Sequence, residues 1–456
     1  MTKKSFVLIS LILFFLIFTI AWASEGHIKS RDDFTGIKNT SSSINKVATQ
    51  STFEGTTFLV DYRDSDLNAD VSTGSNLATF AATRGVSNPA TYMNSSGVLQ
   101  KTETSNVGRF TEGYYDSSGF TAFSKKGLMI EGASTNLLKN SGNIISSADG
   151  WTDDGGTLTE SRTISAPDGT TEATRFTTGT DNDVIYQVTG ATAGGVYTFS
   201  VWLKTSGSAT IDLTLKEQGG DFSFYGSDTK TITSDWRRYT LTATKAADGN
   251  PIRADISDID SSETLDAWGA QLELQPFVTS YIPTVASTLT RNAESLTYVI
   301  SGNRTAATEG MVVKLAPGFA SSLTGNKTIT STDTKDRLMR FDATNDVDFA
   351  PNITDEAGTL VPDLINDSWT ANAEMTLGSN SKAAGSDGAE CFFNGVADGT
   401  NDSATYTGKA WGTDFYIGTE NDGSTSPLQG TIFSIAFFNR VLTAGEHLSL
   451  HNSNQF

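Results

Sequence analysis

The 456-residue chain has little of what most hydrolytic and metal-dependent chemistry requires. It contains one cysteine, Cys391, and three histidines, His27, His447 and His451. A single cysteine excludes an intrachain disulfide and a cysteine-based zinc site, and so few histidines disfavour metal hydrolases and Ser-His-Asp hydrolases. Basic residues are also scarce, because 32 Lys and Arg stand against 52 Asp and Glu, for a net charge of −20. Without clusters of Lys and Arg to bind phosphates, nucleic acid is not an expected partner.

Long apolar runs are absent after the N-terminus. Lys3 and Lys4 precede an apolar run that ends near Ile20, and the small residues Ala21 and Ala23 follow it. This order is typical of a secretory signal, so residues 1–23 are expected to be cleaved. The alternative is an uncleaved anchor, because the run is at the lower limit for crossing a bilayer. Both interpretations place the protein outside the cytoplasm: secreted, at the cell surface or in the periplasm.

Helical periodicity is nearly absent from the rest of the chain. Residues 24–55 are polar and predict a flexible lead-in. After them, short segments such as 197–203, 210–215 and 236–242 have apolar residues at every second position, which buries one face of a strand. Many such segments, separated by Gly, Asp, Asn and Ser, predict an all-β protein. One helix is expected at 444–450, with Thr443 as its N-cap and Leu448 packing inward.

The first β-rich region is expected at residues 56–140. It contains TYMNSSGVL at 91–99, then Arg109-Phe110, then GLMIEGASTNLL at 127–138. The residue pattern alone predicts short strands and a Ser-Gly turn. Their order resembles a segment of bacteriophage virion and tail-associated proteins, which implies a relation to phage tail proteins. The alternative is a β-rich linker to the next domain.

The second region is expected at residues 141–290. It closes with WGAQLE at 268–273 and TSYIPT at 279–284. These strings resemble the jelly-roll carbohydrate-binding modules of the galactose-binding-like class. The resemblance implies a β-sandwich with a sugar-binding surface and a structural calcium.

The third region is expected at residues 291–456. Asn394-Gly395 lies between two apolar segments and predicts a tight hairpin, because both residue types tolerate positive φ. Together with FYIG at 415–418 and the apolar string at 428–438, this region resembles a laminin-G-like, concanavalin-type sandwich. The fold expected for the whole chain is therefore two consecutive β-sandwiches after a small β-rich N-terminal region.

Sugar binding uses aromatic faces for the apolar side of a pyranose and polar groups for its hydroxyls. The candidate ligand-binding residues are Phe222, Phe224, Tyr225, Trp151 and Arg237. The first three lie in a Gly-flanked segment, which predicts a loop. Strand alternation would direct Phe222 and Phe224 to one side and Tyr225 to the other. The alternative is that these aromatics fill the interior of the sandwich.

Calcium is the one cofactor that the sequence suggests, because it prefers carboxylate and carbonyl oxygens. The candidate ligands are Asp181, Asp183, Asp255 and Asp258. None has the spacing of an EF-hand loop, and the alternative is a solvated acidic loop.

The expected function is non-enzymatic adhesion, with a polysaccharide or a cell-surface glycan as partner. Two alternatives remain: an assembly protein of a phage-like particle without sugar binding, and a glycoside hydrolase. The run Asp258 to Glu263 has carboxylates at the spacing found in some glycosidases of the concanavalin type, but its Ser-Ser centre indicates a turn. Assembly into a homo-oligomer is left open.

Overall fold

The computed structural model describes residues 56–67, 71–72, 78–84, 89–146, 150–155, 157–177, 182–219, 221–260, 264–299, 308–322, 325–332, 338–341, 347–350, 368–382, 389–402, 414–420, 426–453 and 456. The expected signal segment and lead-in, residues 1–55, lie outside the described residues. Within the described part of the chain, no helix has the length and apolar character needed to cross a membrane.

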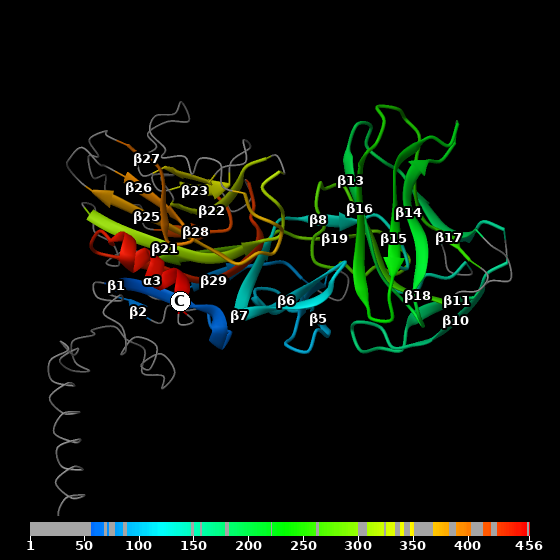
Figure 1. Ribbon diagram of the computed structural model, residues 1–456, viewed down its shortest axis with the longest axis horizontal. Coiled ribbons are helices and arrows are strands. Elements are labelled where there is room, and N and C mark those ends of the chain that lie inside the picture. Colours follow the sequence, from blue (N-terminus) through cyan, green and yellow to red (C-terminus); the bar gives the residue numbers. More distant parts are fainter. Residues whose placement is uncertain are drawn as a thin grey trace, which may run out of the picture.

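The described chain forms two lobes, and strands make up most of both (Figure 1). The jelly-roll lobe contains β9 to β18, drawn mainly in green at one end of the molecule. The sandwich lobe combines strands from the two ends of the described chain, which are drawn in blue and in yellow to red. The prediction of an all-β protein with two sandwiches is confirmed.

The jelly-roll lobe consists of two five-stranded antiparallel sheets. Their strand orders are β10-β11-β18-β13-β16 and β15-β14-β17-β12-β9. Between them lies an apolar core that includes the fully buried Phe199, Leu213 and Ile256. The strands are β9 (Trp151–Asp153), β10 (Thr159–Ile164), β11 (Ala173–Thr177), β12 (Asp183–Thr189), β13 (Val196–Thr205), β14 (Ala209–Glu217), β15 (Phe224–Ile232), β16 (Arg237–Thr244), β17 (Ile252–Ile259) and β18 (Thr264–Glu273).

The sandwich lobe also has two antiparallel sheets around one apolar core. The first has the order β2-β1-β29-β21-β25-β26-β27, with β7 pairing with both β29 and β6, and the second has the order β24-β23-β22-β28-β20-β3. The strands are β1 (Thr56–Asp61), β2 (Val71–Ser72), β3 (Ala78–Ala81), β6 (Arg109–Asp116), β7 (Gly119–Glu131), β20 (Ser295–Val299), β21 (Thr308–Pro317), β22 (Lys327–Thr332), β23 (Leu338–Phe341), β24 (Val347–Ala350), β25 (Met375–Lys382), β26 (Ala389–Phe393), β27 (Val396–Asp402), β28 (Asp414–Ile417) and β29 (Gln429–Phe438), and a 3₁₀ turn, η3 (Tyr62–Asp64), follows β1.

The region expected to stand alone at 56–140 instead supplies strands to the sandwich lobe. The reason lies in β29, all ten residues of which are buried. A buried strand needs hydrogen-bond partners along both edges, because unpaired peptide groups are costly away from water. β21 lies along one edge of β29, and β1 and β7 share the other. The jelly-roll lobe is therefore an insertion within the sandwich lobe.

The chain enters and leaves the jelly-roll lobe through a two-stranded ladder, here called the neck. β8 (Ser134–Asn136) pairs antiparallel with β19 (Leu289–Arg291). Two hairpins that precede the neck also reach the jelly-roll lobe: β4 (Ala90–Met93) with β5 (Leu99–Thr102), and β6 with β7. Met93 and Leu99 of the first hairpin join a buried cluster with Trp202, Trp268 and Tyr281.

Local sequence signals in the sandwich lobe are mostly confirmed. Asn394 and Gly395, with φ of 50° and 79°, form the turn between β26 and β27. The helix α3 (Ala444–Asn452) begins after Thr443, which forms a capping box with Glu446. The prediction for Leu448 was wrong, because Leu448 is exposed whereas His447 and Leu450 are buried.

Candidate functional site

The candidate site is an open edge of the jelly-roll lobe where two phenylalanine side chains face solvent. β15 is the outermost strand of its sheet, and among the described strands it pairs with β14 alone. Phe224 begins β15, and Phe222 lies in the preceding turn with a left-handed backbone (φ 53°). The exposed fractions are 49% for Phe222 and 67% for Phe224, and no other aromatic residue in the described ranges is classed as exposed. We call this pair the aromatic edge.

The turn before β15 is held by backbone hydrogen bonds. The amide of Glu217 donates to the carbonyl of Ser223 (2.9 Å), and the amide of Phe222 donates to the carbonyl of Gly219 (3.4 Å). Gly219 itself has a φ of 103°, a region that side-chain-bearing residues rarely adopt. The glycine therefore lets the chain turn sharply enough to present Phe222 beside the strand.

Tyr225, the third aromatic residue predicted to bind the ligand, differs from the two phenylalanines in its surroundings. It is half-buried and packs against the core of the jelly-roll lobe. Its hydroxyl donates to Asp248 (3.4 Å), and the Lys245 ammonium lies 5.6 Å from its ring centroid. Burial is the main cause that raises its pKa. The prediction of Tyr225 as an exposed ligand contact is therefore corrected: its ring packs against the core of the jelly-roll lobe.

Polar groups flank the aromatic edge. The Lys216 ammonium lies 5.7 Å from the Phe224 ring centroid and 2.8 Å from Asp255. Gln218 has a buried side-chain oxygen that has no hydrogen-bond partner in the described structure. Phe224 beside the Lys216 ammonium combines an apolar face with a polar group, the two kinds of contact that a pyranose ring uses.

Two of the sequence candidates do not belong to this edge. Trp151 is buried in the core, and its indole Nε1 donates to the carbonyls of Lys139 and Asn140 (both 3.2 Å). Arg237 begins β16, where its Nη1 donates to the carbonyl of Ser117 at the tip of the β6–β7 hairpin (3.1 Å). Both predictions as ligand contacts are therefore corrected: Trp151 packs the core and Arg237 joins the two lobes.

The four aspartates proposed for calcium lie in different surroundings. Asp181 lies outside the described residues. Asp183 is buried and accepts a hydrogen bond from Thr157 (2.6 Å), and Asp255 is buried and accepts one from Arg253 (2.7 Å). Asp258 has a φ of 62°, and its pKa is raised by burial and by nearby acidic groups. In the stretches that the structure describes, no three His, Cys, Asp or Glu side chains gather as a metal site.

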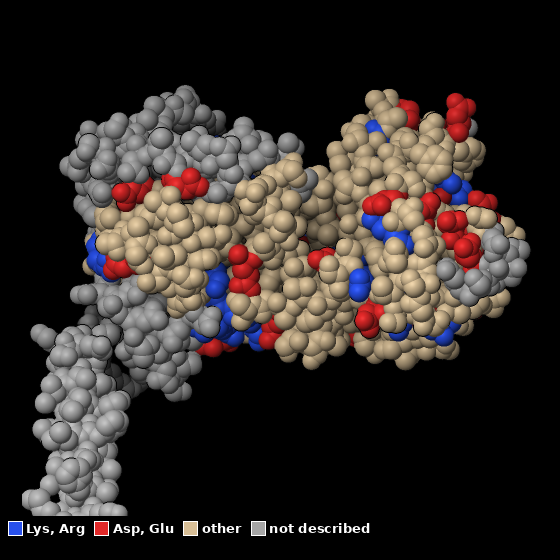
Figure 2. Space-filling model, viewed as in Figure 1, with Lys and Arg blue, Asp and Glu red and all other residues tan. Residues whose placement is uncertain are grey.

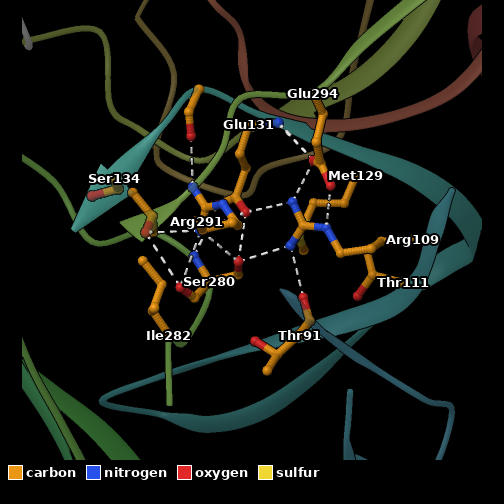
Figure 3. Close-up of polar contacts among 12 residues, drawn as sticks. Thr91, Arg109, Thr111, Met129, Glu131, Ser134, Ser280, Ile282, Arg291 and Glu294 are labelled. Carbon is orange, nitrogen blue, oxygen red and sulfur yellow. Dashed lines mark hydrogen bonds and ion pairs between the residues drawn. The ribbon is translucent and has the colours of Figure 1, made fainter. Parts of the chain in front are cut away.

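The sequence reasoning missed a buried cluster of charged side chains beside the neck (Figure 3). Arg109 of β6 is fully buried, and its Nε and Nη2 donate to the two oxygens of Glu294 (2.8 and 2.5 Å). Nη2 also donates to Glu131 at the end of β7 (2.7 Å). Arg291 of β19 is paired with Glu131 (3.2 Å), and Arg84 with Glu294.

This charged cluster connects the two lobes. The backbone amide and the hydroxyl of Ser280, from the closing segment of the jelly-roll lobe, both donate to Glu131 (2.8 and 2.5 Å). Burial alone would raise the pKa of Glu131, but Arg291 and Arg109 lower it to about 2. The carboxylate is therefore ionised at neutral pH and fixes Ser280 against the sandwich lobe.

A sequence signal for this cluster was present. Arg109, Glu131 and Ser280 each lie in one of the strings at 109–110, 127–138 and 279–284. Each string contains a polar residue inside an otherwise strand-like segment. In the structure the three strings meet beside the neck, where Glu131 contacts both Arg109 and Ser280.

Comparison with known proteins supports the sandwich assignment for the third region. Residues 320–446 match the family described as the concanavalin A-like lectin/glucanases superfamily. The match covers less than a third of the chain and falls within the sandwich lobe. Comparison with the curated proteins found no match.

Several solved structures resemble parts of the chain. They include a structure described as "CBM4 structure and function" (20% identity, 30% of this chain, 92% of that chain, TM-score 0.23) and a family 16 carbohydrate-binding module-2 (18%, 30%, 99%, TM-score 0.25). A Trypanosoma rangeli sialidase with the inhibitor DANA is 13% identical over 35% of this chain, with a TM-score of 0.27, and the match spans 26% of the sialidase. At these TM-scores the likenesses carry no argument about function.

Proposed function

We propose that the protein is a non-enzymatic adhesion protein, secreted or on the cell surface, that binds a polysaccharide or a cell-surface glycan at the aromatic edge. The observation that carries the proposal is the exposure of Phe222 and Phe224, separated by one residue, at the open edge of a sheet. The lectin-related family match of the sandwich lobe supports the same class of function.

The exposed rings of Phe222 and Phe224 do not stabilise the core, so we assign them a role in binding: stacking on a sugar. Exposed aromatic side chains contribute little to a core, and large ones in contact with water mark binding surfaces. A sugar ring stacked on a phenylalanine removes apolar surface from water, which is worth about 25 cal/mol per Å². Two exposed rings can therefore contact a sugar chain, with the Lys216 ammonium beside Phe224.

The proposal is binding without hydrolysis. A retaining glycosidase needs two carboxyl groups about 5 Å apart, one as acid and one as nucleophile. In the run Asp258 to Glu263, considered above for such a pair, Glu263 lies outside the described residues. Calcium binding and a relation to phage tail proteins remain predictions from the resemblances.

The surface charge is consistent with a glycan rather than a nucleic acid as partner. On the face drawn in Figure 2, Lys and Arg occur in small groups among Asp and Glu, over both lobes. A neutral polysaccharide has no charge that this acidic surface would repel.

A glycan array probed with the full chain tests the proposal. We expect binding to a subset of polysaccharides, and a loss of that signal in Phe222→Ala and Phe224→Ala. Leu448→Ala is the matched control, because it removes an exposed apolar side chain from the sandwich lobe. The absence of any sugar-dependent signal would favour an assembly protein, and release of reducing sugar would favour a glycosidase.

A further inference from the structure

An open pocket of about 440 Å³ lies between the neck and the jelly-roll lobe. Three separate parts of the chain line it: the neck, the loop of residues 190–192 between β12 and β13, and residues 274–275 after β18. Its volume is within the range of about 300–1,000 Å³ that small-molecule sites occupy. The pocket shares no residue with the aromatic edge, so it is a second candidate site.

The neck presents different chemistry on its two faces. Arg291 faces the charged cluster, where it is paired with Glu131 (Figure 3). Successive side chains of a strand point to opposite faces, so Thr290 lies on the other face, opposite Thr135 of β8. Thr290 is exposed and Thr135 is half-buried, and their hydroxyls are 2.7 Å apart at the pocket. Because each hydroxyl can form more than one hydrogen bond, the pair retains capacity for a ligand.

Two further polar side chains at the pocket are accessible. Thr192 is exposed and Gln275 is half-buried, and neither side chain forms a hydrogen bond with another residue that the structure describes. Their backbone groups hold them in place: the amide of Thr192 donates to the Tyr197 hydroxyl (2.5 Å), and the carbonyl of Gln275 accepts from the Thr198 hydroxyl (2.8 Å). The Thr192 hydroxyl and the Gln275 amide can therefore bond to a ligand without breaking an existing hydrogen bond.

Apolar side chains lie among these polar groups. Leu274 is 46% exposed and Leu137 is half-buried, and both line the pocket. A Cβ atom at Gly195 would meet Leu274 Cδ1 at 2.6 Å, so the leucine lies against the loop between β12 and β13. Hydroxyl and amide groups around an apolar surface match a sugar ring, which has hydroxyls at its edge and C–H groups on its face.

The described residues that line the pocket carry no charged side chain: none of them is Asp, Glu, Lys, Arg or His. Glu273 precedes Leu274 in the chain, but it is fully buried and accepts a hydrogen bond from Ser134 (2.7 Å). The pocket therefore offers an anion no cation to pair with, and the net charge of −20 repels anions from the whole chain. These observations favour an uncharged ligand.

We propose that this pocket binds an uncharged sugar unit of a glycan, with the sugar hydroxyls on Thr135, Thr290 and Gln275 and its apolar face on Leu274. This inference rests on the proposed function and adds to it a site that selects uncharged units. Because the neck supplies one wall, the ten strands of the jelly-roll lobe do not form this pocket alone.

The methyl groups of Leu274 report on the pocket directly. We would label the leucine methyl groups of the full chain with ¹³C, assign the Leu274 signals with Leu274→Met, and titrate glucose, galactose, mannose and lactose. We expect a saturable shift with at least one of these sugars, and an affinity at least tenfold lower for sodium glucuronate and sodium galacturonate at constant ionic strength. No shift with any of the four sugars, or an equal affinity for a uronate, would overturn the proposal. A shift with 1-hexanol alone would identify an apolar occupant and overturn it as well.

Two glycines provide a matched test of the site. A Cβ atom at Gly190, in the pocket, or at Gly207, between β13 and β14, would meet nothing within 4 Å, and neither glycine has a positive φ. Gly190→Trp is expected to fill the pocket and to lower the affinity for the bound sugar at least tenfold. Gly207→Trp is the control and should bind like the parent.

Gln275→Ala gives a second test should Gly190→Trp not fold. It removes one polar contact and is expected to lower the affinity several-fold. Phe224→Ala should leave the Leu274 shift unchanged, so a failure of the aromatic edge, which the proposed function requires, would be distinguishable. Parental affinity in both Gly190→Trp and Gln275→Ala would show that the sugar does not bind in this pocket.

Discussion

Arg109 and Glu294 are joined by two hydrogen bonds although 185 residues separate them in the chain. The whole jelly-roll lobe lies between them in sequence. Their pairing therefore closes the insertion at its base, and Glu131 extends the contact to Ser280 of the inserted lobe. Burial alone would lower the pKa of Arg109, but Glu294 and Glu131 outweigh this effect and raise it.

Removing one partner from this buried pair should destabilise the fold strongly. Glu294→Ala leaves Arg109 and Arg84 without their shared carboxylate, and breaking a buried pair in this way costs about 3–5 kcal/mol. Glu172→Ala, in an exposed pair with Arg162, is the control and should cost less than about 1 kcal/mol. Urea denaturation measures both changes, and similar small losses would show that the cluster does not hold the neck.

The sandwich lobe should not fold from its C-terminal part alone. A fragment of residues 291–456 lacks β1 and β7, so one edge of the buried strand β29 would be unpaired. We expect this fragment to show no cooperative thermal transition by circular dichroism, whereas a chain of residues 56–456 should show one. A cooperative melt of the fragment at the temperature of the longer chain would mean that the N-terminal strands are dispensable.

Acid should destabilise the sandwich lobe through His447. Burial lowers the pKa of this histidine to about 3, from an ordinary value of 6.5, and its ring stacks on Phe392. Between these values the unfolded chain binds a proton that the folded chain does not, so stability falls as the pH drops from about 6.5 towards 3. Glu131 adds a further loss as the pH falls from about 4.5 to 2.

His447→Phe separates the two contributions. The variant keeps an aromatic ring against Phe392 but cannot bind the proton. Its melting temperature should therefore change less than that of the parent between pH 6.5 and 4.5, where Glu131 does not yet contribute. Parallel curves for the two proteins would assign the acid sensitivity to other groups.

Trp151 should behave as a core residue. Its buried indole donates to two backbone carbonyls. Trp151→Ala therefore leaves a cavity, and both carbonyls lose this hydrogen bond. We expect a loss of about 3–5 kcal/mol of stability, as for other large-to-small core changes. Stability is measured by denaturation and glycan binding by titration on one sample. A loss of glycan binding without this destabilisation would show that Trp151 contacts the ligand.

Local features of the fold were predictable because their causes are local. The alternation at 197–203, 210–215 and 236–242 corresponds to β13, β14 and β16, and Asn394-Gly395 forms its hairpin turn. Thr443 caps α3 because its own hydroxyl reaches the amide of Glu446.

Long-range pairing was not predictable from these patterns. The alternation of apolar residues shows that a strand has a buried face, but it does not show which strand lies beside it. The pairing of β1 with β29 was therefore not predictable from the sequence of β1. The exposure of Phe222 and Phe224 was predicted, whereas Tyr225, predicted beside them, packs against the core. The residue types of Trp151 and Arg237 did not indicate their roles, because the burial of Trp151 and the contact of Arg237 with Ser117 arise from long-range packing.

The central claim is that Phe222 and Phe224 bind the glycan without holding the fold together. Isothermal titration of the full chain with the best polysaccharide from the array, alongside Phe222→Ala, Phe224→Ala and the control Leu448→Ala, tests it most directly. We predict that each phenylalanine variant binds several-fold more weakly, with an unchanged melting temperature, and that the control binds like the parent. Parental affinity in both phenylalanine variants, or a stability loss of about 3 kcal/mol or more in either, would contradict the account.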